Sequence, residues 1–372
     1  MVRHRSPHRA TWDTRLLFLV ALVLVVFGIA AVYGASSIVA VQAGRPGSTF
    51  ALRQLIGATI GGAAMLIGSR VEYHMWQRLA WPMLGVVSLL LLILLLPFAS
   101  PIVLEINGSR RWIGVSGFSV QPAEFAKFAV VAWTAMLAVR KGSRLRNFRR
   151  GLLPFVVILI PVAGLVLFEP ALSSALLVCL LAGVVLFSAG ARIGHFLVMG
   201  VFMIPFLWRE ITEVQYRMQR WMSFLGSGTD YAESGWQIQQ SLIGMGAGRW
   251  FGVGFGQGMQ KMGYLPYGYS DFIFSTIGEE WGFVGASLLI GLFAIFIAIG
   301  LHIARTAADR FGTLLAVGIT AMIGVTAFIH IAVTLGIVPT TGLPLPFISY
   351  GRSNLIVSMF ATGVLINIGE RR

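Results

Sequence analysis

The sequence predicts an all-α polytopic integral membrane protein with about ten transmembrane helices. Hydrophobic residues make up 57% of the 372 positions and charged residues only 11%, whereas soluble domains carry roughly 25% charge. Long apolar runs recur along the whole chain. In lipid, such continuous and non-alternating runs form helices, because a helix satisfies its own backbone hydrogen bonds. We therefore expect a single transmembrane domain over residues 1–372.

The positions of the apolar runs define the expected helices. The first run follows a basic segment, but it is too long for the apolar core of a signal peptide, and further spans follow it. Between the fifth and sixth runs stands Glu169-Pro170, and proline interrupts a helix. The predicted helices cover residues 16–38, 50–69, 79–98, 122–139, 152–168, 171–188, 193–208, 271–301, 313–336 and 355–368.

Lysine and arginine are concentrated in every second connection between these helices. Six of them lie in the short segment 140–150, which the positive-inside rule places in the cytoplasm together with the tail 1–15 and both termini. The net charge of +14 is then explained by contact with anionic membrane lipids, and no nucleic acid partner is expected. The segments 1–15, 70–78, 140–150, 191–194, 302–312 and 369–372 hold 17 of the 28 basic residues.

The longest connection, residues 209–270, is predicted to be a large outer loop between the seventh and eighth helices. Its glycine-rich part, FGVGFGQG at 251–258, lacks the strand and helix that flank a dinucleotide site. The single cysteine, Cys179, excludes a disulfide framework and disfavours a cysteine-based metal site. No internal repeat is visible, which weakens an inverted-repeat transporter as an interpretation.

Three carboxylates, Asp271, Glu279 and Glu280, stand at the start of the eighth predicted helix and inside it. Charges at membrane depth usually face a bundle interior or a cavity. One interpretation is structural: Ser270 or Asp271 caps the helix, and the two glutamates pair with buried arginines. The other is functional, because Asp271, Ser275 and Glu279 would share one face of a helix that begins at Asp271.

Charged side chains gather at the outer ends of the predicted helices. Arginine and lysine bind phosphate oxygens and a carboxylate can act as a general base, so this surface suits a substrate with a lipid tail and an anionic head. Glu124 and Lys127 share a helix face, either as a buried ion pair or as part of a polar cavity. The proline-rich segment 338–354 is predicted to be a cavity wall. The charged residues at these ends are Arg110, Arg111, Glu124, Lys127, Glu169, Arg217, Arg220, Lys261, Asp271 and Arg352.

Several of these stretches together resemble the SEDS family (shape, elongation, division, sporulation) of the FtsW, RodA and SpoVE type. The resemblance covers all ten predicted helices in order. Residues 33–37 and the adjacent Arg110 and Arg111 favour the division-type FtsW branch. The matching pieces are NGSRRWI at 107–113, QPAEFAK at 121–127, LP at 265–266, DFIF at 271–274, GEE at 278–280 and PTTGLPLPFISYG at 339–351.

The resemblance implies a peptidoglycan glycosyltransferase that polymerises lipid II at the outer face of the bacterial inner membrane, in division or elongation. Undecaprenyl pyrophosphate would be the leaving group. Implied partners are a class B penicillin-binding protein, the growing glycan strand, other divisome or elongasome membrane proteins, and membrane lipids. No tightly bound cofactor is expected, although Mg²⁺ or Mn²⁺ would suit the leaving group. A lipid II flippase and a non-catalytic scaffold that activates a penicillin-binding protein stay open as alternatives.

The family's motifs also assign roles to single residues. Asp271 matches the essential acidic residue and is the candidate general base. Lys127 and nearby arginines would stabilise the charge of the leaving group. The candidate substrate-binding residues are Glu124, Lys127, Arg110, Arg111, Trp112, Arg217, Arg220 and Lys261. The candidate supporting residues are Glu169, Glu279, Glu280, Pro344 and Ser349.

Four positions depart from the family pattern. Tyr267 and Tyr269 stand where the family has an acidic residue and a histidine. Ala171 replaces an aspartate, and we expect the nearby Glu169 to substitute for it. Arg352 replaces a glycine and adds a positive charge near the outer face.

Overall fold

A computed structural model describes residues 12–96, 102–106, 109–115, 118–225 and 233–371 of the chain. Within them, nine helices are long and apolar enough to span a membrane, and α6 is a shorter apolar helix, so the prediction of about ten transmembrane helices is confirmed. These helices are α1 (Trp12–Gln42), α2 (Thr49–Arg70), α3 (Tyr73–Leu95), α4 (Pro122–Lys141), α5 (Leu153–Phe168), α6 (Leu172–Ser188), α7 (Ile193–Thr212), α10 (Ile273–Thr306), α11 (Arg310–Thr334) and α12 (Arg352–Glu370).

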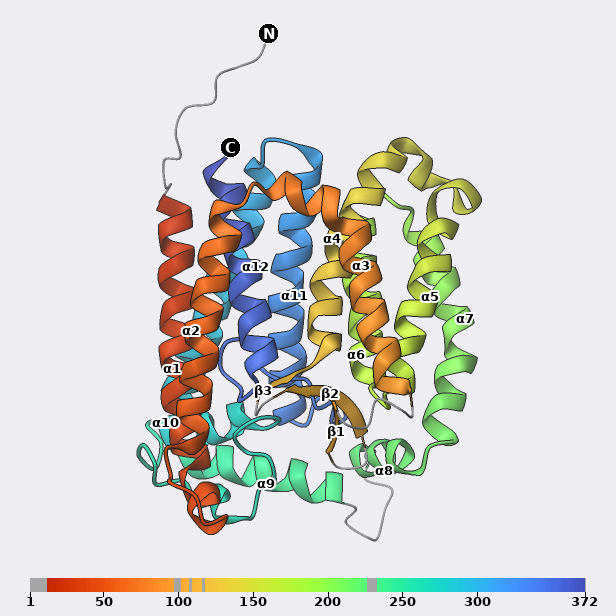
Figure 1. The fold of residues 1–372 in the computed structure, drawn as a ribbon. Coiled ribbons are helices and arrows are strands. Elements are labelled where there is room, and N and C mark those ends of the chain that lie inside the picture. Colours follow the sequence, from red (N-terminus) through yellow and green to blue (C-terminus); the bar gives the residue numbers. More distant parts are fainter. Residues whose placement is uncertain (1–11, 97–101, 107–108, 116–117, 226–232, 372) are drawn as a thin grey trace.

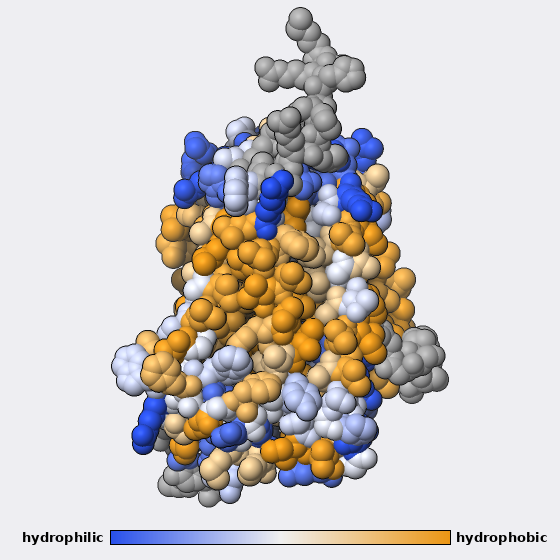
Figure 2. All heavy atoms as spheres, turned by 90° about the vertical axis from the view of Figure 1, so that its left-hand side faces the viewer, coloured by the Kyte–Doolittle hydropathy of each residue, from blue (hydrophilic) through white to orange (hydrophobic). Residues whose placement is uncertain are grey.

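The helices form one bundle with different structure at its two ends (Figure 1). The first turn of α1 and the last turn of α12 lie at the same end. The strands within residues 103–120 and the two helices within residues 215–248 lie at the opposite end. A hydrophobic belt separates two more polar ends on the face shown in Figure 2, as expected for a multi-pass membrane protein. Most of the predicted cytoplasmic tail, residues 1–11, lies outside the described residues.

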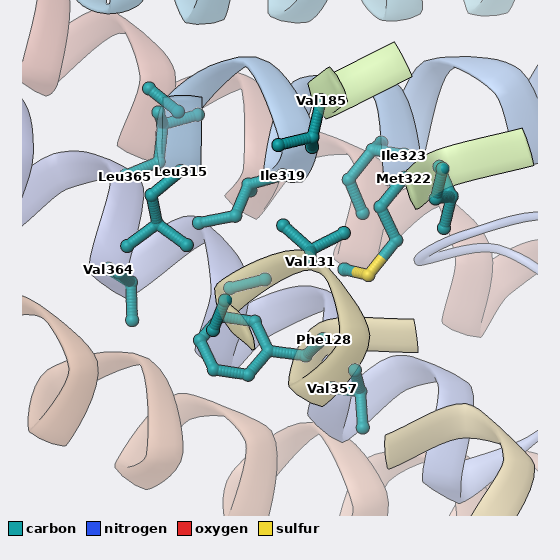
Figure 3. Packing of buried hydrophobic residues seen from close by; sticks show 14 of the residues in the cluster. Phe128, Val131, Val185, Leu315, Ile319, Met322, Ile323, Val357, Val364 and Leu365 are labelled. Carbon is teal, nitrogen blue, oxygen red and sulfur yellow. The ribbon is translucent and has the colours of Figure 1, made fainter. Parts of the chain in front are cut away.

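The centre of the bundle is built by α4, α11 and α12, which are mostly buried. Figure 3 shows Phe128 and Val131 of α4 packed among side chains of α6, α11 and α12. Gly318 of α11 lies so close to Val131 and Val185 that a side chain there would overlap them. Small residues at such crossings let membrane helices approach closely. By contrast α7, described over its whole length, has no buried residue.

Two regions between the predicted helices contain regular structure. Residues 105–121 contribute to an antiparallel sheet of β1 (Val103–Ile106), β2 (Ser109–Val115) and β3 (Phe118–Val120). Asn107-Gly108 stands between β1 and β2 in the sequence and is typical of two-residue hairpins, although both residues lie outside the described ones. The outer loop 209–270 contains the end of α7 as well as α8 (Gln215–Phe224), α9 (Glu233–Gly248) and η4 (Gln260–Met262). The remaining short elements, η2 (Gly142–Arg146) and η3 (Phe148–Leu152), join α4 to α5.

The start of α10 corrects the sequence prediction. The helix begins at Ile273, with Phe272 at the N-cap, so neither Ser270 nor Asp271 caps it. Because Asp271 precedes the helix, the prediction that it shares a helical face with Ser275 and Glu279 is wrong. The Ser275 hydroxyl instead donates to the Ser241 carbonyl, over 2.8 Å.

The helix α10 is broken at Gly282. Gly282 has a left-handed φ of 67° inside the helix, a conformation that glycine adopts without a steric penalty. The amides after the break donate outside the helix, Phe283 N–H to the Arg249 carbonyl (2.8 Å) and Val284 N–H to the Trp250 carbonyl (3.1 Å). The loop after α9 therefore packs against α10 at the level of this break.

Candidate active site

Asp271 lies in the short segment between η4 and α10, at the end of the bundle opposite the termini. Its amide donates to the carbonyl of Tyr267 (3.0 Å), and Tyr267 itself has a left-handed φ of 58°. The side chain is partly exposed and adjoins Gly342 of the segment between α11 and α12. Burial raises the pKa of Asp271, whereas Arg220, a hydrogen bond from Ser270, and Arg111 act in the opposite direction. Asp271 is thus a partly exposed residue whose carboxylate is influenced by the charges of two guanidinium groups.

The two arginines come from different elements and are held by backbone carbonyls. Arg111 of β2 donates through Nε to the Glu169 carbonyl (2.9 Å) and through a terminal nitrogen to the Pro170 carbonyl. Arg220 of α8 donates to the Thr340 carbonyl (3.3 Å). Arg–carbonyl bonds of this kind fix the guanidinium without neutralising its charge. Both cations therefore stay available to an anion.

Tyr216 connects these parts of the site. Its hydroxyl donates to the Pro170 carbonyl (3.0 Å). The same carbonyl accepts a hydrogen bond from Arg111. The Arg220 guanidinium lies over the Tyr216 ring at 5.4 Å from the centroid, a cation–π distance. Sequence reasoning missed Tyr216, and the only signal in the sequence was its place directly before Arg217 and four residues before Arg220.

Glu169 is almost completely buried, with 1% of its surface exposed. Neither of its carboxyl oxygens has a hydrogen-bond partner among the described residues. Burial raises its pKa to about 8, and Arg111 opposes this shift. Glu169 thus lies beside the cationic part of the site, as a carboxyl group that favours its protonated form at neutral pH.

The irregular segment between α11 and α12 holds the segment that carries Asp271 through hydrogen bonds. The hydroxyl of Ser349 donates to the Ser270 carbonyl (2.6 Å) and accepts from the Leu345 amide (2.8 Å). The amide of Tyr350 donates to the Tyr269 carbonyl (3.1 Å). Pro344 lies in the same irregular segment and is partly buried. The long proline-rich motif therefore holds the backbone of the two residues directly before Asp271.

Tyr269, one of the two tyrosines that depart from the family pattern, packs against aromatic rings next to this segment. The Tyr269 ring lies 4.9 Å from Phe50 and 5.8 Å from Tyr350, measured between centroids, and Phe50 and Tyr350 are 5.1 Å apart. Such aromatic contacts stabilise beyond the area that they bury. Arg352 bonds to the Ser119 hydroxyl (3.3 Å), which joins the start of α12 to β3.

Glu124 and Lys127 form an ion pair of 2.6 Å with both side chains about 95% buried. Asn354 of α12 donates to the same Glu124 carboxylate (2.9 Å). This contact joins α4 to α12 within the bundle. Direct contact of the pair with a substrate stays a prediction.

Lys261 is also turned into the protein. Its ammonium lies 2.8 Å from Glu280, with both side chains 2% exposed, and it donates to the Gly34 carbonyl of α1 (3.2 Å). Glu279 accepts from the amides of Met259 (2.7 Å) and Gln260 (3.3 Å). The glutamates therefore pair with a lysine and with loop amides, and the expectation of buried arginine partners is wrong.

The remaining candidate substrate-binding residues, Arg110, Trp112 and Arg217, lie at the same end of the molecule. Each contacts a residue other than Asp271. Arg110 donates to the Leu96 carbonyl (3.2 Å). Trp112 is partly buried and pairs with Leu104 across the sheet. Arg217 is 7% exposed and forms an ion pair with Glu210. The structure thus groups Arg111, Arg220 and Asp271, and it gives Arg110, Arg217 and Lys261 separate partners.

A bundle of apolar helices with a carboxylate and two guanidinium groups at one end defines a polytopic membrane protein with a charged site at the end of its bundle. The chain belongs to the FtsW, RodA and SpoVE family: the family pattern, described as "Cell cycle protein", matches residues 14–372. The resemblance stated from the motifs is therefore confirmed.

Relatives match over nearly their whole length. The chain is 40% identical to the "Probable peptidoglycan glycosyltransferase FtsW" of Trichlorobacter lovleyi, over 98% of this chain and 95% of the relative. It is 38% identical to "Stage V sporulation protein E" of Bacillus subtilis, over 95% and 96% respectively.

Two solved structures have the same fold. One comes from a study of the "structural coordination of polymerization and crosslinking by a peptidoglycan synthase complex"; it has a TM-score of 0.76 and 26% identity, covering 95% of this chain and 96% of that one. The other is the rod shape determining protein RodA of Thermus thermophilus, with a TM-score of 0.70, 26% identity and coverages of 95% and 96%.

Proposed function

We propose that this chain is a peptidoglycan glycosyltransferase that polymerises lipid II at the outer face of the inner membrane. Relatives named for this activity match almost the whole chain, and the charged site lies at the end of the bundle opposite the described termini. With the termini in the cytoplasm, as the positive-inside rule predicts, the site faces the compartment in which glycan strands are assembled.

The observation that carries the mechanism is the partly exposed Asp271 carboxylate beside Arg111 and Arg220. Asp271 takes the proton from the acceptor sugar hydroxyl while the hydroxyl oxygen attacks the anomeric carbon of the donor. The bond between that carbon and the diphosphate oxygen breaks, and undecaprenyl diphosphate leaves with the electron pair. Arg111 and Arg220 stabilise the negative charge on this leaving group. Attack opposite the leaving group inverts the anomeric centre in one displacement, so a second carboxylate nucleophile is not required.

A divalent cation would contribute further stabilisation of the diphosphate charge. Among the described residues, no three His, Cys, Asp or Glu side chains converge on one point. Such an ion would therefore take most of its ligands from diphosphate oxygens and water, as Mg²⁺ commonly does, with Asp271 as the accessible protein carboxylate. Chelation by EDTA, followed by addition of Mg²⁺ or Mn²⁺, tests this dependence.

The proposed partner is a class B penicillin-binding protein that supplies the crosslinking activity. The similar solved structure from a peptidoglycan synthase complex supports this assignment. A division role is favoured by the relatives named FtsW, because the motif resemblance links the FtsW branch to division. Expression of the chain in cells depleted of their division-type or elongation-type homologue distinguishes the two roles.

The decisive experiment measures polymerisation of purified lipid II in detergent by the chain together with its penicillin-binding partner. We expect Asp271→Asn to abolish glycan synthesis, and Glu213→Gln, which alters an exposed carboxylate paired with Arg209, to leave it unchanged. Glycan synthesis by a folded Asp271→Asn variant at the wild-type rate would overturn the assignment. A flippase would show no polymerisation in detergent, and a scaffold would tolerate loss of Asp271.

A further inference from the structure

The proposed mechanism leaves the buried carboxyl group of Glu169 without a role. The residue ends α5 and is 1% exposed. Both carboxyl oxygens lack a hydrogen-bond donor within the described part of the chain. A buried ionised carboxylate without donors is strongly unfavourable, because it loses its hydration and gains nothing in return.

The positive charge of Arg111 favours ionisation of the Glu169 carboxyl group. The Arg111 guanidinium, however, donates its hydrogen bonds to backbone carbonyls and not to the Glu169 carboxyl oxygens. Its Nε donates to the main-chain carbonyl of Glu169 (2.9 Å), and a second nitrogen donates to the Pro170 carbonyl. A guanidinium that neutralises a carboxylate usually forms a forked pair with the two carboxylate oxygens. Here the fork is directed at two backbone carbonyls, so the positive charge of Arg111 is not cancelled by Glu169.

The charge of the whole cluster follows from this geometry. The titratable groups around Arg111 are Glu169 at the end of α5, Tyr216 and Arg220 on α8, and Asp271 before α10. With Glu169 neutral, Arg111 and Arg220 outnumber the single charge of Asp271, which leaves the cluster positive. With Glu169 ionised, the cluster is neutral and loses its electrostatic attraction for a diphosphate.

We propose that Glu169 is a positioning residue that keeps its proton at neutral pH and so leaves Arg111 free to bind the donor diphosphate. This inference rests on the proposed function. Glu169 does not touch the reacting atoms; it acts through Arg111. The burial that raises the pKa of Glu169 to about 8 places its ionisation just above neutral pH.

The expected signature is an alkaline weakening of donor binding. If only the protonated form binds donor, a group with a pKa of about 8 makes kcat/KM fall about tenfold between pH 7 and pH 9. The change lies in KM, because the diphosphate contact exists in the ground state as well as in the transition state. Glu169→Gln, which keeps the shape and removes the ionisation, should show a flat KM over this range.

The test measures kcat and KM for lipid II from pH 6.5 to pH 9.5 for the wild type, Glu169→Gln and the exposed-site control Glu213→Gln. We expect the wild type and the control to show the same rise in KM, and Glu169→Gln to lack it. A wild-type KM that stays constant to pH 9, or a rise that persists in Glu169→Gln, overturns the inference. Neither result affects the proposed function, which fails only if the wild type does not polymerise or Asp271→Asn does.

A spectroscopic measurement keeps the inference testable if Glu169→Gln does not fold. Infrared spectra of the complete wild-type protein in H₂O and D₂O detect a protonated carboxyl group at pH 7. We expect its band to disappear by pH 9.5 and to persist at pH 7 in Asp271→Asn, which excludes Asp271 as its source. Absence of a band that titrates between pH 7 and pH 9.5 would show that Glu169 is already ionised and would overturn the inference.

Discussion

The hydroxyl of Ser349 donates a 2.6 Å hydrogen bond to the carbonyl of Ser270, the residue directly before the candidate base Asp271. The two serines are 79 positions apart in the sequence. The same hydroxyl accepts from the Leu345 amide, so one side chain joins two irregular segments that meet at the site. Precise placement of a catalytic group depends on such supporting contacts.

Ser349→Ala should therefore reduce catalysis by displacing Asp271. Loss of the hydroxyl leaves the Ser270 carbonyl and the Leu345 amide without their partner, at a cost of about 1–3 kcal/mol. We expect kcat for lipid II polymerisation to fall about tenfold, with a smaller change in KM. Thr59→Ala is the matched control, because that hydroxyl is exposed and donates to the Leu55 carbonyl within its own helix. Equal kcat values for Ser349→Ala and the wild type would refute a positioning role.

The pH dependence of activity should report the environment of Asp271. Burial raises the pKa of Asp271 above its ordinary value of 3.8, and a general base must be unprotonated. We expect kcat/KM to fall, as the solution is acidified, at a higher pH than a free aspartate would give. An acid limb at or below pH 4 would contradict this environment.

The raised pKa of Asp271 also predicts how Asp271→Asn changes the thermal stability of the protein. A carboxyl group whose folded pKa is raised stabilises the fold below its unfolded pKa, and this stabilisation is lost as the pH rises through the folded pKa. At pH 7 the ionised Asp271 therefore destabilises the wild type, and the neutral asparagine removes this effect. We expect Asp271→Asn to have the higher melting temperature in detergent at pH 7, and the difference to shrink towards pH 4. A lower melting temperature at pH 7 would be inconsistent with burial of the charge.

The buried pair Lys261–Glu280 should behave unlike an exposed pair of the same length. Lys261→Met leaves the Glu280 carboxylate buried without its cation, which typically costs about 3–5 kcal/mol. We expect a large loss of thermal stability, and a partial recovery in Lys261→Met/Glu280→Gln. The control is Arg209→Met, since the Arg209–Glu213 pair is also 2.8 Å long but exposed, and exposed pairs contribute little. Similar melting temperatures for the two single variants would contradict this assignment.

Gly282 should not tolerate a side chain. It has a φ of 67°, and a Cβ there would lie 2.3 Å from the Gly252 amide nitrogen, so Gly282→Ala combines backbone strain with overlap. We expect poor expression or a strongly lowered melting temperature. Gly291→Ala in the same helix meets nothing within 4 Å and should be neutral or slightly stabilising. A stable Gly282→Ala variant would show that α10 can become continuous.

The sequence by itself determined the membrane class, the approximate helices and the family. Apolar runs must become helices in lipid because no water satisfies their backbone, and this rule needs no tertiary information. Asp271 was singled out for the same reason, since an ionisable group at a membrane boundary requires an explanation. The family motifs then indicated Ser349 and the surrounding segment, although not the contact that it makes.

Only the tertiary structure decided which charges meet. Arg111, Arg220 and Lys261 look equivalent in the sequence, yet the charges of the first two act on Asp271 and the third is buried against Glu280. Partner choice depends on packing between distant segments, which local patterns do not encode. The start of α10 at Ile273 rather than Asp271, and the exclusion of hydrogen-bond donors from Glu169 within the described residues, follow from the same long-range packing. The sequence supplied the reactive groups, and the fold set their spacing, burial and charge state.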